Sequence, residues 1–217
     1  MSPPTVTATA RRTSDARRRQ SAVRRRRRRS VLALGAVGLL VLAVVLATPL
    51  FKRAVNDLTL PLTHQDIIRQ QAQEKRLDPA LIAAVIYGET KFDPRPSSAG
   101  AQGLMQILPA TAEFLARRSG ATSFRTADLA TPQVNIAYGS YYLRYLLDSY
   151  GQSTMLALAA YNGGQANVDR WVADARAQGH ALTEAEIPFP ETRDYVARVL
   201  QAQKDYRRTY PAELGYQ

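Results

Sequence analysis

A single carboxylate, Glu89, ends an apolar stretch of sequence that has the periodicity of a helix. Asp78 and Pro79 form a strong helix start, because a capping oxygen precedes a residue of preset φ. The apolar residues that follow at helical spacing are Leu81, Ile82, Val85 and Ile86. At about 100° per residue, Glu89 falls on the side of this stripe. We therefore expect a helix over 81–89 with Glu89 facing the core at its C-terminal end.

These expected surroundings favour the protonated form of Glu89. Burial disfavours a carboxylate, and so does the negative end of the helix dipole. Gly88 is expected to leave open space beside the carboxyl group. A carboxyl that keeps its proton near neutral pH can serve as a general acid. The alternative is an ordinary glutamate that reaches solvent or pairs with an arginine.

A loop of small and polar residues follows, and it ends in Leu104-Met105-Gln106. It contains Ser98 and Gly103, and such residues allow close backbone approach to a ligand and supply neutral hydrogen bonds. The apolar residues at its end predict that the loop is pinned to the core. A further helix is expected from Pro109 to Arg118.

The order of the sequence blocks resembles the lytic transglycosylases of the soluble lytic transglycosylase (SLT) type, which have a lysozyme-like fold. Over about residues 63–207, the blocks are Glu89-Thr90, Ser98-Ala99-Gly100-Ala101, Gly103-Leu104-Met105-Gln106, Pro109-Ala110-Thr111-Ala112, Asn135-Ile136 with Gly139, Ala160-Tyr161-Asn162-Gly163-Gly164, Trp171, Ile187-Pro188-Phe189, Glu191-Thr192-Arg193 and Tyr195-Val196. Each block is weak alone, and their shared order is specific. Thr90 is a departure, because the family usually has Ser there; the hydroxyl is kept and a methyl is added.

The resemblance implies cleavage of peptidoglycan glycan strands by one carboxyl group. Glu89 would protonate the oxygen between N-acetylmuramic acid and N-acetylglucosamine. It would then take the proton of the muramyl C6 hydroxyl, which closes on C1 as a 1,6-anhydro ring. Ser98 and Tyr195 would position Glu89, and Met105 would offer the sugar an apolar face. The full set of implied substrate-binding residues is Ser98, Gly103, Met105, Gln106, Tyr161, Asn162, Glu191 and Tyr195. No cofactor or metal is expected.

Two alternatives remain open. Ordinary glycosidases use two carboxylates, and the candidates for a second one are Asp93, Glu113, Asp128 and Glu191. An aspartate facing Glu89 would favour a hydrolytic muramidase of the goose-type-lysozyme kind. The other alternative is a non-catalytic peptidoglycan-binding protein, in which Thr90 would mark decay of the site. Retention of Glu89, Gln106 and Tyr161 together argues against it.

Composition restricts the class of protein further. The 217 residues suffice for one domain with extensions. Cysteine is absent, which excludes disulfides and a thiolate nucleophile, and only His64 and His180 could supply imidazole to a metal. Residues 1–30 hold 11 of the 29 lysines and arginines and one of the 18 acidic residues, so the rest of the chain is nearly neutral. This distribution argues against nucleic-acid binding.

The N-terminal region predicts attachment to a membrane. Residues 1–30 read as a disordered, basic cytoplasmic tail. Residues 31–51 carry no charge and span roughly 31 Å as a helix, about one hydrocarbon thickness. The arginine run 24–29 precedes them, which favours a single-pass signal anchor with the catalytic domain outside the cytoplasm. The alternatives are a signal peptide cleaved near Val45-Leu46-Ala47, with secretion of the domain, or twin-arginine export. No motif for a protein partner is visible.

An all-α catalytic domain is predicted over 63–210, after a linker over 52–62. Thr63 and Asp66 resemble a capping box that opens a helix to about Arg76. The other helices are expected from 131 to about 150 (the longest), from 154 to 163, from 165 to 178 and from 191 to 208, with polar connections over 120–130 and 179–190. Ser153 is expected to cap one helix, and Gly163-Gly164 to end it.

Aromatic residues crowd two of these predicted helices. The tyrosines of the 131–150 helix include Tyr138, Tyr141, Tyr142 and Tyr145. They fit either core packing with solvated hydroxyls or a platform for sugar rings. Trp171 is expected in the core, and Asn135 is placed to tie its helix to the Gly103–Gln106 loop.

Overall fold

The computed structural model describes residues 32, 34–45, 48, 55, 59–95 and 97–216. Two compact units divide the chain, Met1–Val55 and Asn56–Gln217. In the first unit, residues 34–45 are helical and their apolar side chains are exposed. No helix in the described part of the chain has the length and apolar character needed to cross a membrane. The predicted tail 1–30 lies outside the described residues, and so do seven positions of the predicted anchor 31–51, namely 31, 33, 46, 47 and 49–51.

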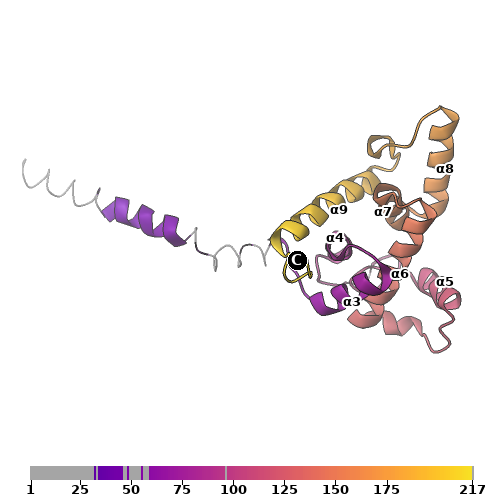
Figure 1. Cartoon of the computed structure of the whole chain (residues 1–217), viewed down its shortest axis with the longest axis horizontal. Helices are drawn as coiled ribbons and strands as arrows, with labels where there is room; N and C mark the ends of the chain where they lie inside the picture. The colour runs from indigo at the N-terminus through magenta and orange to yellow at the C-terminus, as the bar shows by residue number, and fades with distance from the viewer. Residues whose placement is uncertain are drawn as a thin grey trace, which may run out of the picture. The chain divides into compact units, whose positions relative to one another are not determined.

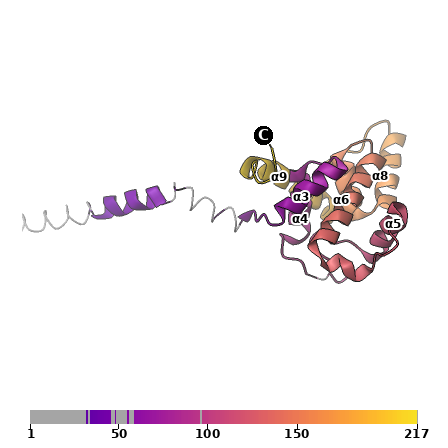
Figure 2. The ribbon, with the colours of Figure 1, turned by 60° about the horizontal axis from the view of Figure 1, so that its bottom comes forward.

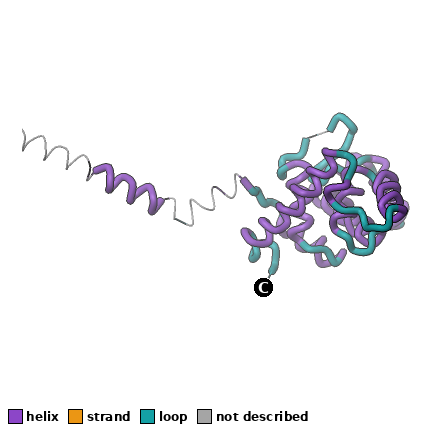
Figure 3. Tube along the Cα trace, turned by 90° about the horizontal axis from the view of Figure 1, so that it is seen from above, coloured by secondary structure: helices purple, strands orange, loops and turns teal. Residues whose placement is uncertain are grey.

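The second unit is built from helices and the loops that join them (Figures 1 and 3). In chain order these are α3 (Gln65–Lys75), α4 (Pro79–Thr90), α5 (Pro109–Ser119), η1 (Thr126–Ala130), α6 (Pro132–Ser149), α7 (Thr154–Gly163), α8 (Gln165–Ala177), η2 (Glu184–Glu186) and α9 (Pro190–Thr209). The described residues contain no strand, and an isolated bridge pairs Gln102 with Ile107. The predicted all-α class is confirmed.

Helix α4 forms the centre of the core. Residues 80–86 are buried around the whole helix, since neighbours cover it on every side. It makes its most extensive contact with α9 and also packs on α3, which lies beside α6 (Figure 2). A side chain of the Leu or Ile type contributes roughly 1.5–3 kcal/mol when fully buried. The residues just before Glu89 therefore anchor it through apolar packing.

Close packing of α4 on α9 occurs at Gly88. A Cβ atom there would lie 2.7 Å from Cγ2 of Val199 and 3.3 Å from Cε2 of Tyr195. The expectation of open space on that side of Gly88 is therefore wrong: α9 occupies the space. The missing side chain instead lets α9 approach, which places Tyr195 next to the end of α4.

Local capping rules explain most helix ends. The Asp78 side chain accepts a hydrogen bond from the Ala80 amide at 3.0 Å, and Ser153 accepts one from Leu156 at 3.3 Å. Both starts were predicted, as was the stop of α7 before Gly164. The capping box predicted at Thr63 is wrong, because α3 begins after His64. His64 has a left-handed backbone (φ 58°), and its side chain makes no capping hydrogen bond. Helix α9, with 20 residues, is also longer than α6, with 18.

The second unit extends beyond the predicted limits 63–210. Three tyrosine hydroxyls donate to consecutive backbone carbonyls of the segment before α3. The pairs are Tyr87 with Thr59, Tyr210 with Leu60, and Tyr206 with Pro61. After α9, Leu214 is buried and the Tyr216 hydroxyl contacts Asp78. The described end of the predicted linker, 59–62, is thus fastened to the helical unit.

Candidate active site

Glu89 is the penultimate residue of α4, and its side chain is half-buried. It lines a hollow of about 370 Å³, whose other described lining residues are Gly88, Thr90, Lys91, Asp93, Arg95 and Gln106. Lys91 and Phe92 have left-handed backbones, with φ of 51° and 64°, so the chain turns sharply away after α4. The turn leaves the carboxyl group at the edge of the core, beside open space.

Burial raises the pKa of Glu89 to about 7. The Tyr195 hydroxyl and the positive charge of Arg198 act in the opposite direction and lower the pKa without cancelling the effect of burial. A carboxyl group with this pKa is populated in both protonation states near neutral pH. It can therefore donate a proton in one step and accept one in the next, as the expectation for Glu89 requires.

Two tyrosines enclose the carboxyl group from α7 and α9. Burial, and then the charge of Glu89, raise the pKa of Tyr161 and of Tyr195 well above the ordinary value, so both remain protonated donors. The Tyr161 hydroxyl donates to the Met105 carbonyl at 2.8 Å. The buried Tyr195 hydroxyl completes no hydrogen bond of standard geometry, although it is close enough to Glu89 to lower its pKa. The Tyr195 hydroxyl therefore lies near the carboxyl group without a hydrogen bond of standard geometry to it.

Asn135 of α6 holds the loop that faces Glu89. Its side-chain oxygen accepts from the Met105 amide at 2.8 Å, and its amide donates to the carbonyls of Gln102 at 2.8 Å and Leu129 at 3.0 Å. A Cβ atom on Gly103, whose φ is 73°, would lie only 2.1 Å from the Asn135 amide nitrogen. The predicted tie between this helix and the loop is confirmed, and Gly103 makes room for it.

The residue after Glu89 also joins α4 to this loop. The Thr90 hydroxyl lies 2.9 Å from the Leu104 carbonyl and 3.1 Å from the Ile86 carbonyl, in position to donate to either. The hydroxyl that Thr90 shares with serine thus connects the helix of Glu89 to the loop of Gln106. The added methyl group does not prevent this contact.

Gln106 lines the same hollow as Glu89, and its predicted contact with substrate stays a prediction. Its side-chain amide donates to the carbonyls of Gly103 at 2.8 Å and Arg95 at 3.1 Å, and its backbone is left-handed with φ 48°. Met105 differs from the expectation, because its side chain is fully buried and packs where a Cβ on Gly139 would collide with it. It offers a sugar no exposed apolar face in this structure; its backbone instead links Asn135 to Tyr161.

Three other predicted residues lie outside the described lining of the hollow. Ser98 is exposed in a turn, and Glu191 is exposed in the first turn of α9. Asn162 is exposed at the end of α7, where its oxygen accepts a hydrogen bond from Thr192 at 2.8 Å. Their assignment to the substrate-binding site stays a prediction.

Only one of the candidate second carboxylates shares the hollow with Glu89. Asp93 lines it and forms an exposed ion pair of 2.7 Å with Arg95. The others are Glu113, which is 4.0 Å from Arg117 on α5, Asp128, which accepts from the Arg125 amide, and the exposed Glu191. The described residues contain no group of three or more histidines and carboxylates that could hold a metal ion.

Aromatic rings continue from the site over α6. The Tyr142 ring lies 5.3 Å from that of Tyr161 and 6.3 Å from that of Tyr145, which in turn contacts Phe114 at 5.4 Å. The Arg118 guanidinium lies over the Tyr145 ring at 5.1 Å. Half-buried rings in this arrangement fit both interpretations of the tyrosine stripe. Trp171, by contrast, is buried, as expected.

Arg198 is a charged residue near the site that the sequence reasoning missed. It follows Tyr195 by three residues on α9, which puts both on one side of that helix. Its charge lowers the pKa of both Glu89 and Tyr195. The available signal was this spacing, which places a cation one helical turn after a tyrosine of the site.

Two curated proteins of known sequence are similar to this chain. Over 150 residues, the chain is 33% identical to the soluble lytic murein transglycosylase of Salmonella typhimurium, which covers 68% of this chain and 23% of that protein. It is 31% identical over 167 residues to the membrane-bound lytic murein transglycosylase C of Edwardsiella ictaluri. This match covers 66% of this chain and 46% of the Edwardsiella protein. The chain thus spans about a quarter of the length of the Salmonella relative and less than half of the Edwardsiella one.

Solved structures and a family model give the same result. The lytic transglycosylase Slt of Pseudomonas aeruginosa, an inactive mutant in which glutamine replaces a glutamate, matches with a TM-score of 0.67 and 33% identity over 72% of this chain and 26% of its own. The 70 kDa soluble lytic transglycosylase of Escherichia coli matches with a TM-score of 0.65 and 28% sequence identity. This match covers 70% of this chain and 25% of the Escherichia coli one. Residues 66–183 match the family model described as "Transglycosylase SLT domain". This match covers more than half of the 217-residue chain. The chain therefore belongs to the SLT transglycosylase family.

Proposed function

We propose that the chain is a peptidoglycan lytic transglycosylase in which Glu89 is both acid and base. The observation that carries the proposal is the half-buried carboxyl group that lines an open hollow, with a pKa raised by burial to about 7 and two protonated tyrosines near it. A group that must first give and then take a proton works best with a pKa near the working pH. A single carboxyl suffices if the substrate supplies its own nucleophile.

The proposed reaction has two steps. Glu89 donates its proton to the glycosidic oxygen between N-acetylmuramic acid and N-acetylglucosamine, and the bond from muramyl C1 to that oxygen breaks with its electron pair on the leaving sugar. The muramyl N-acetyl group stabilises the electron-poor C1. Glu89, now a carboxylate, takes the proton of the muramyl C6 hydroxyl while O6 bonds to C1. The product is a 1,6-anhydromuramyl end, Glu89 is protonated again, and no water is consumed.

Several neighbours have supporting roles in the proposal. The Tyr195 hydroxyl would stabilise the carboxylate formed between the two steps, because a hydrogen bond to the charged form lowers its energy. Tyr161 and Asn135 fix the Met105 backbone, which leaves Gln106 free to face a sugar with its side-chain oxygen. Ser98, Gly103, Asn162 and Glu191 complete the proposed substrate-binding site.

The relatives support this choice of reaction. The chain resembles curated lytic murein transglycosylases of soluble and membrane-bound kinds. The Pseudomonas structure is of a mutant that is inactive with glutamine in place of one glutamate, which fits a reaction that needs a glutamate carboxyl group. A 70 kDa soluble lytic transglycosylase similar to this chain has also been solved in complex with bulgecin A.

A hydrolytic muramidase is the second candidate, and Asp93 is the observation that favours it. This carboxylate lines the same hollow as Glu89. If it oriented a water molecule towards C1, the product would be a reducing end. In the structure, however, the Asp93 carboxylate is already engaged in an exposed ion pair with Arg95. We therefore rank this function second.

The deciding experiment is mass spectrometry of the muropeptides that the full-length protein releases from purified peptidoglycan, with Glu89→Gln in parallel. Anhydromuramyl products that disappear in the variant are the expected result. Reducing-end products would replace the proposal with hydrolysis and turn attention to Asp93. An absence of products from the wild type would leave the non-catalytic binding protein.

We further propose that residues 31–51 anchor the protein in the membrane with its helical unit outside the cytoplasm. The exposed apolar helix over 34–45, the arginine run before it and the membrane-bound relative support the proposal. Fractionation of cells that produce the full chain, followed by N-terminal sequencing, tests it. Intact protein in the membrane fraction is expected, whereas soluble protein that begins near Thr48 would mean a cleaved signal peptide.

A further inference from the structure

We propose that a groove along α9 binds the carboxylate-bearing peptide part of peptidoglycan, with Arg198 as the partner of a carboxylate. The inference rests on the proposed function and assigns a second binding site next to the catalytic hollow. The ligand class is an acidic peptide that is still attached to the sugar strand.

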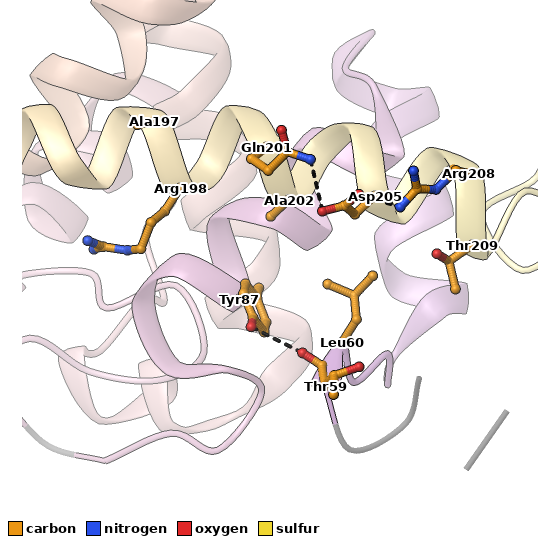
Figure 4. Close-up of a pocket in the computed structure, with 10 residues that line it drawn as sticks. All are labelled: Thr59, Leu60, Tyr87, Ala197, Arg198, Gln201, Ala202, Asp205, Arg208 and Thr209. Atoms are coloured by element: carbon orange, nitrogen blue, oxygen red, sulfur yellow. Dashed lines mark hydrogen bonds and ion pairs between the residues drawn. The ribbon is translucent and has the colours of Figure 1, made fainter. Parts of the chain in front are cut away.

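The groove has a volume of about 650 Å³ and lies between α9 and the chain that leads into α3 (Figure 4). Gln201, Ala202 and Asp205 form part of the α9 wall, and the opposite wall includes Leu60 and Tyr87. The Tyr87 hydroxyl donates to the Thr59 carbonyl at 3.1 Å, which fixes that wall in place. The groove is therefore larger than the hollow at Glu89, which measures about 370 Å³, and has room for several residues of a peptide.

The charged residues of the groove that the structure describes are paired at one end and include an unpaired cation at the other, which favours a ligand with a carboxylate. At one end, Arg208 pairs with Asp205 at 2.8 Å, and Gln201 donates to the same aspartate at 3.2 Å. At the other end lies Arg198, which extends away from that pair (Figure 4). Arg198 is exposed and has no ion pair with a carboxylate among the described residues. An unpaired guanidinium is suited to bidentate binding of a carboxylate.

The groove and the catalytic hollow adjoin along the chain. Tyr87 lines the groove, and Gly88 and Glu89, the next two residues of α4, line the hollow. On α9, Arg198 follows Tyr195 by one helical turn, and its charge acts on Glu89. The Arg198 end of the groove is therefore the end nearer Glu89. This is where the first carboxylate of an attached peptide would meet a cation.

The test compares two substrates with the full-length protein: glycan strands that carry their peptides, and the same strands after an amidase has removed them. Arg198→Gln should raise KM for peptide-bearing strands about tenfold, the loss typical of one charge-assisted hydrogen bond. It should leave KM for bare strands unchanged and change kcat by the same factor for both strand types, because the charge of Arg198 also acts on Glu89. Arg198→Lys, which keeps the charge, should recover part of the loss. Lys204→Gln is the matched control, because it removes one positive charge from an exposed position of the same helix outside the groove lining.

Binding can also be measured without turnover. Free peptide released by the amidase is titrated into the inactive variant Glu89→Gln, with and without Arg198→Gln, and its carboxylates are amidated in a control titration. Weaker binding after loss of either the guanidinium or the carboxylates is expected. Equal effects of Arg198→Gln on KM for both strand types, or no effect on KM for either, would overturn the peptide site while cleavage of bare strands still upheld the proposed function. Cleavage of neither strand type by the wild type would remove the proposed function, and the peptide site with it.

Discussion

Asp78 and Glu89 are carboxyl groups at opposite ends of helix α4, and their surroundings differ in almost every respect. Asp78 accepts hydrogen bonds from the Ala80 amide, from the Gln203 side chain and from the Tyr216 hydroxyl. Arg207 adds an ion pair. Glu89 receives no backbone donor in the described structure, and a tyrosine hydroxyl approaches it without standard hydrogen-bond geometry.

The direction of the helix explains this difference. The first turn of a helix presents free N–H groups and the positive end of the dipole, whereas the last turn presents carbonyl oxygens and the negative end. A carboxylate is therefore stabilised at Asp78 and left without such partners at Glu89. The same functional group fastens the fold at one end of α4 and keeps a transferable proton at the other. Each prediction below alters one side of this contrast.

The largest expected effect is the loss of activity in Glu89→Gln. The rate of strand cleavage should fall roughly 10²–10⁴-fold, the usual contribution of a general acid–base group. The free energy of unfolding at pH 7 should rise, by up to about 3 kcal/mol, because the variant removes a charge that burial and the negative end of the helix disfavour. Muropeptide release and urea unfolding measure the two quantities. A variant that lost its activity by unfolding would remove the contrast with Asp78.

Asn135→Ala is expected to damage the catalytic end through its supporting loop. It removes three hydrogen bonds, to the Met105 amide and to the carbonyls of Gln102 and Leu129, and it leaves the buried Met105 amide without a partner. The expected loss in free energy of unfolding is about 2–4 kcal/mol, together with lower activity. Urea titration measures the loss, and Gln133→Ala, at an exposed position of the same helix, is the control. Equal stability of the two variants would contradict the role given to Asn135.

Local sequence rules predicted much of this contrast. The Asp78-Pro79 start, the apolar stripe and the placement of Glu89 at the end of α4 follow from capping and periodicity. The cap at Ser153 and the stop at Gly164 follow in the same way. Such features depend on residues a few positions apart, so the sequence alone contains the information.

Features that depend on distant packing were harder to predict. Gly88 was expected to leave space, but Val199, more than a hundred residues later, fills it. Met105 was expected to face a sugar, but Gly139 opens a place for it in the core. Arg198 attracted no notice, because its position beside Glu89 depends on how α9 crosses α4. Each of these depends on which helix lies opposite, and one sequence does not reveal that.

The pH dependence of stability gives the next effect in size. Burial raises the pKa of Glu89 from 4.5 to about 7, so the folded state holds a proton that the unfolded chain releases at lower pH. The contribution to stability is complete below pH 4.5 and is lost as pH rises to about 7, by up to about 3 kcal/mol. Urea unfolding of the wild type and of Glu89→Gln across this pH range isolates the contribution of Glu89. All other titratable groups are the same in the two proteins, so their contributions cancel in the difference. A constant difference between the two would contradict the raised pKa.

The smallest effect is expected at the other end of the helix, for Asp78→Ala. This change removes the cap of α4 and the contacts to Gln203, Arg207 and Tyr216. Loss of an N-cap costs about 1 kcal/mol and a partly exposed ion pair up to about 1 kcal/mol more. Urea unfolding should therefore show a loss of about 1–2 kcal/mol, and kcat should remain that of the wild type.

Asp78→Asn separates the two contributions, because asparagine caps a helix as well as aspartate does but carries no charge for Arg207. It should keep most of the stability that Asp78→Ala loses. If Asp78→Asn were as unstable as Asp78→Ala, the ion pair rather than the cap would fasten this end of α4. If either variant lowered kcat, the two ends of the helix would not be independent, because a change near Asp78 would then reach Glu89 through the packing of α4 against α9.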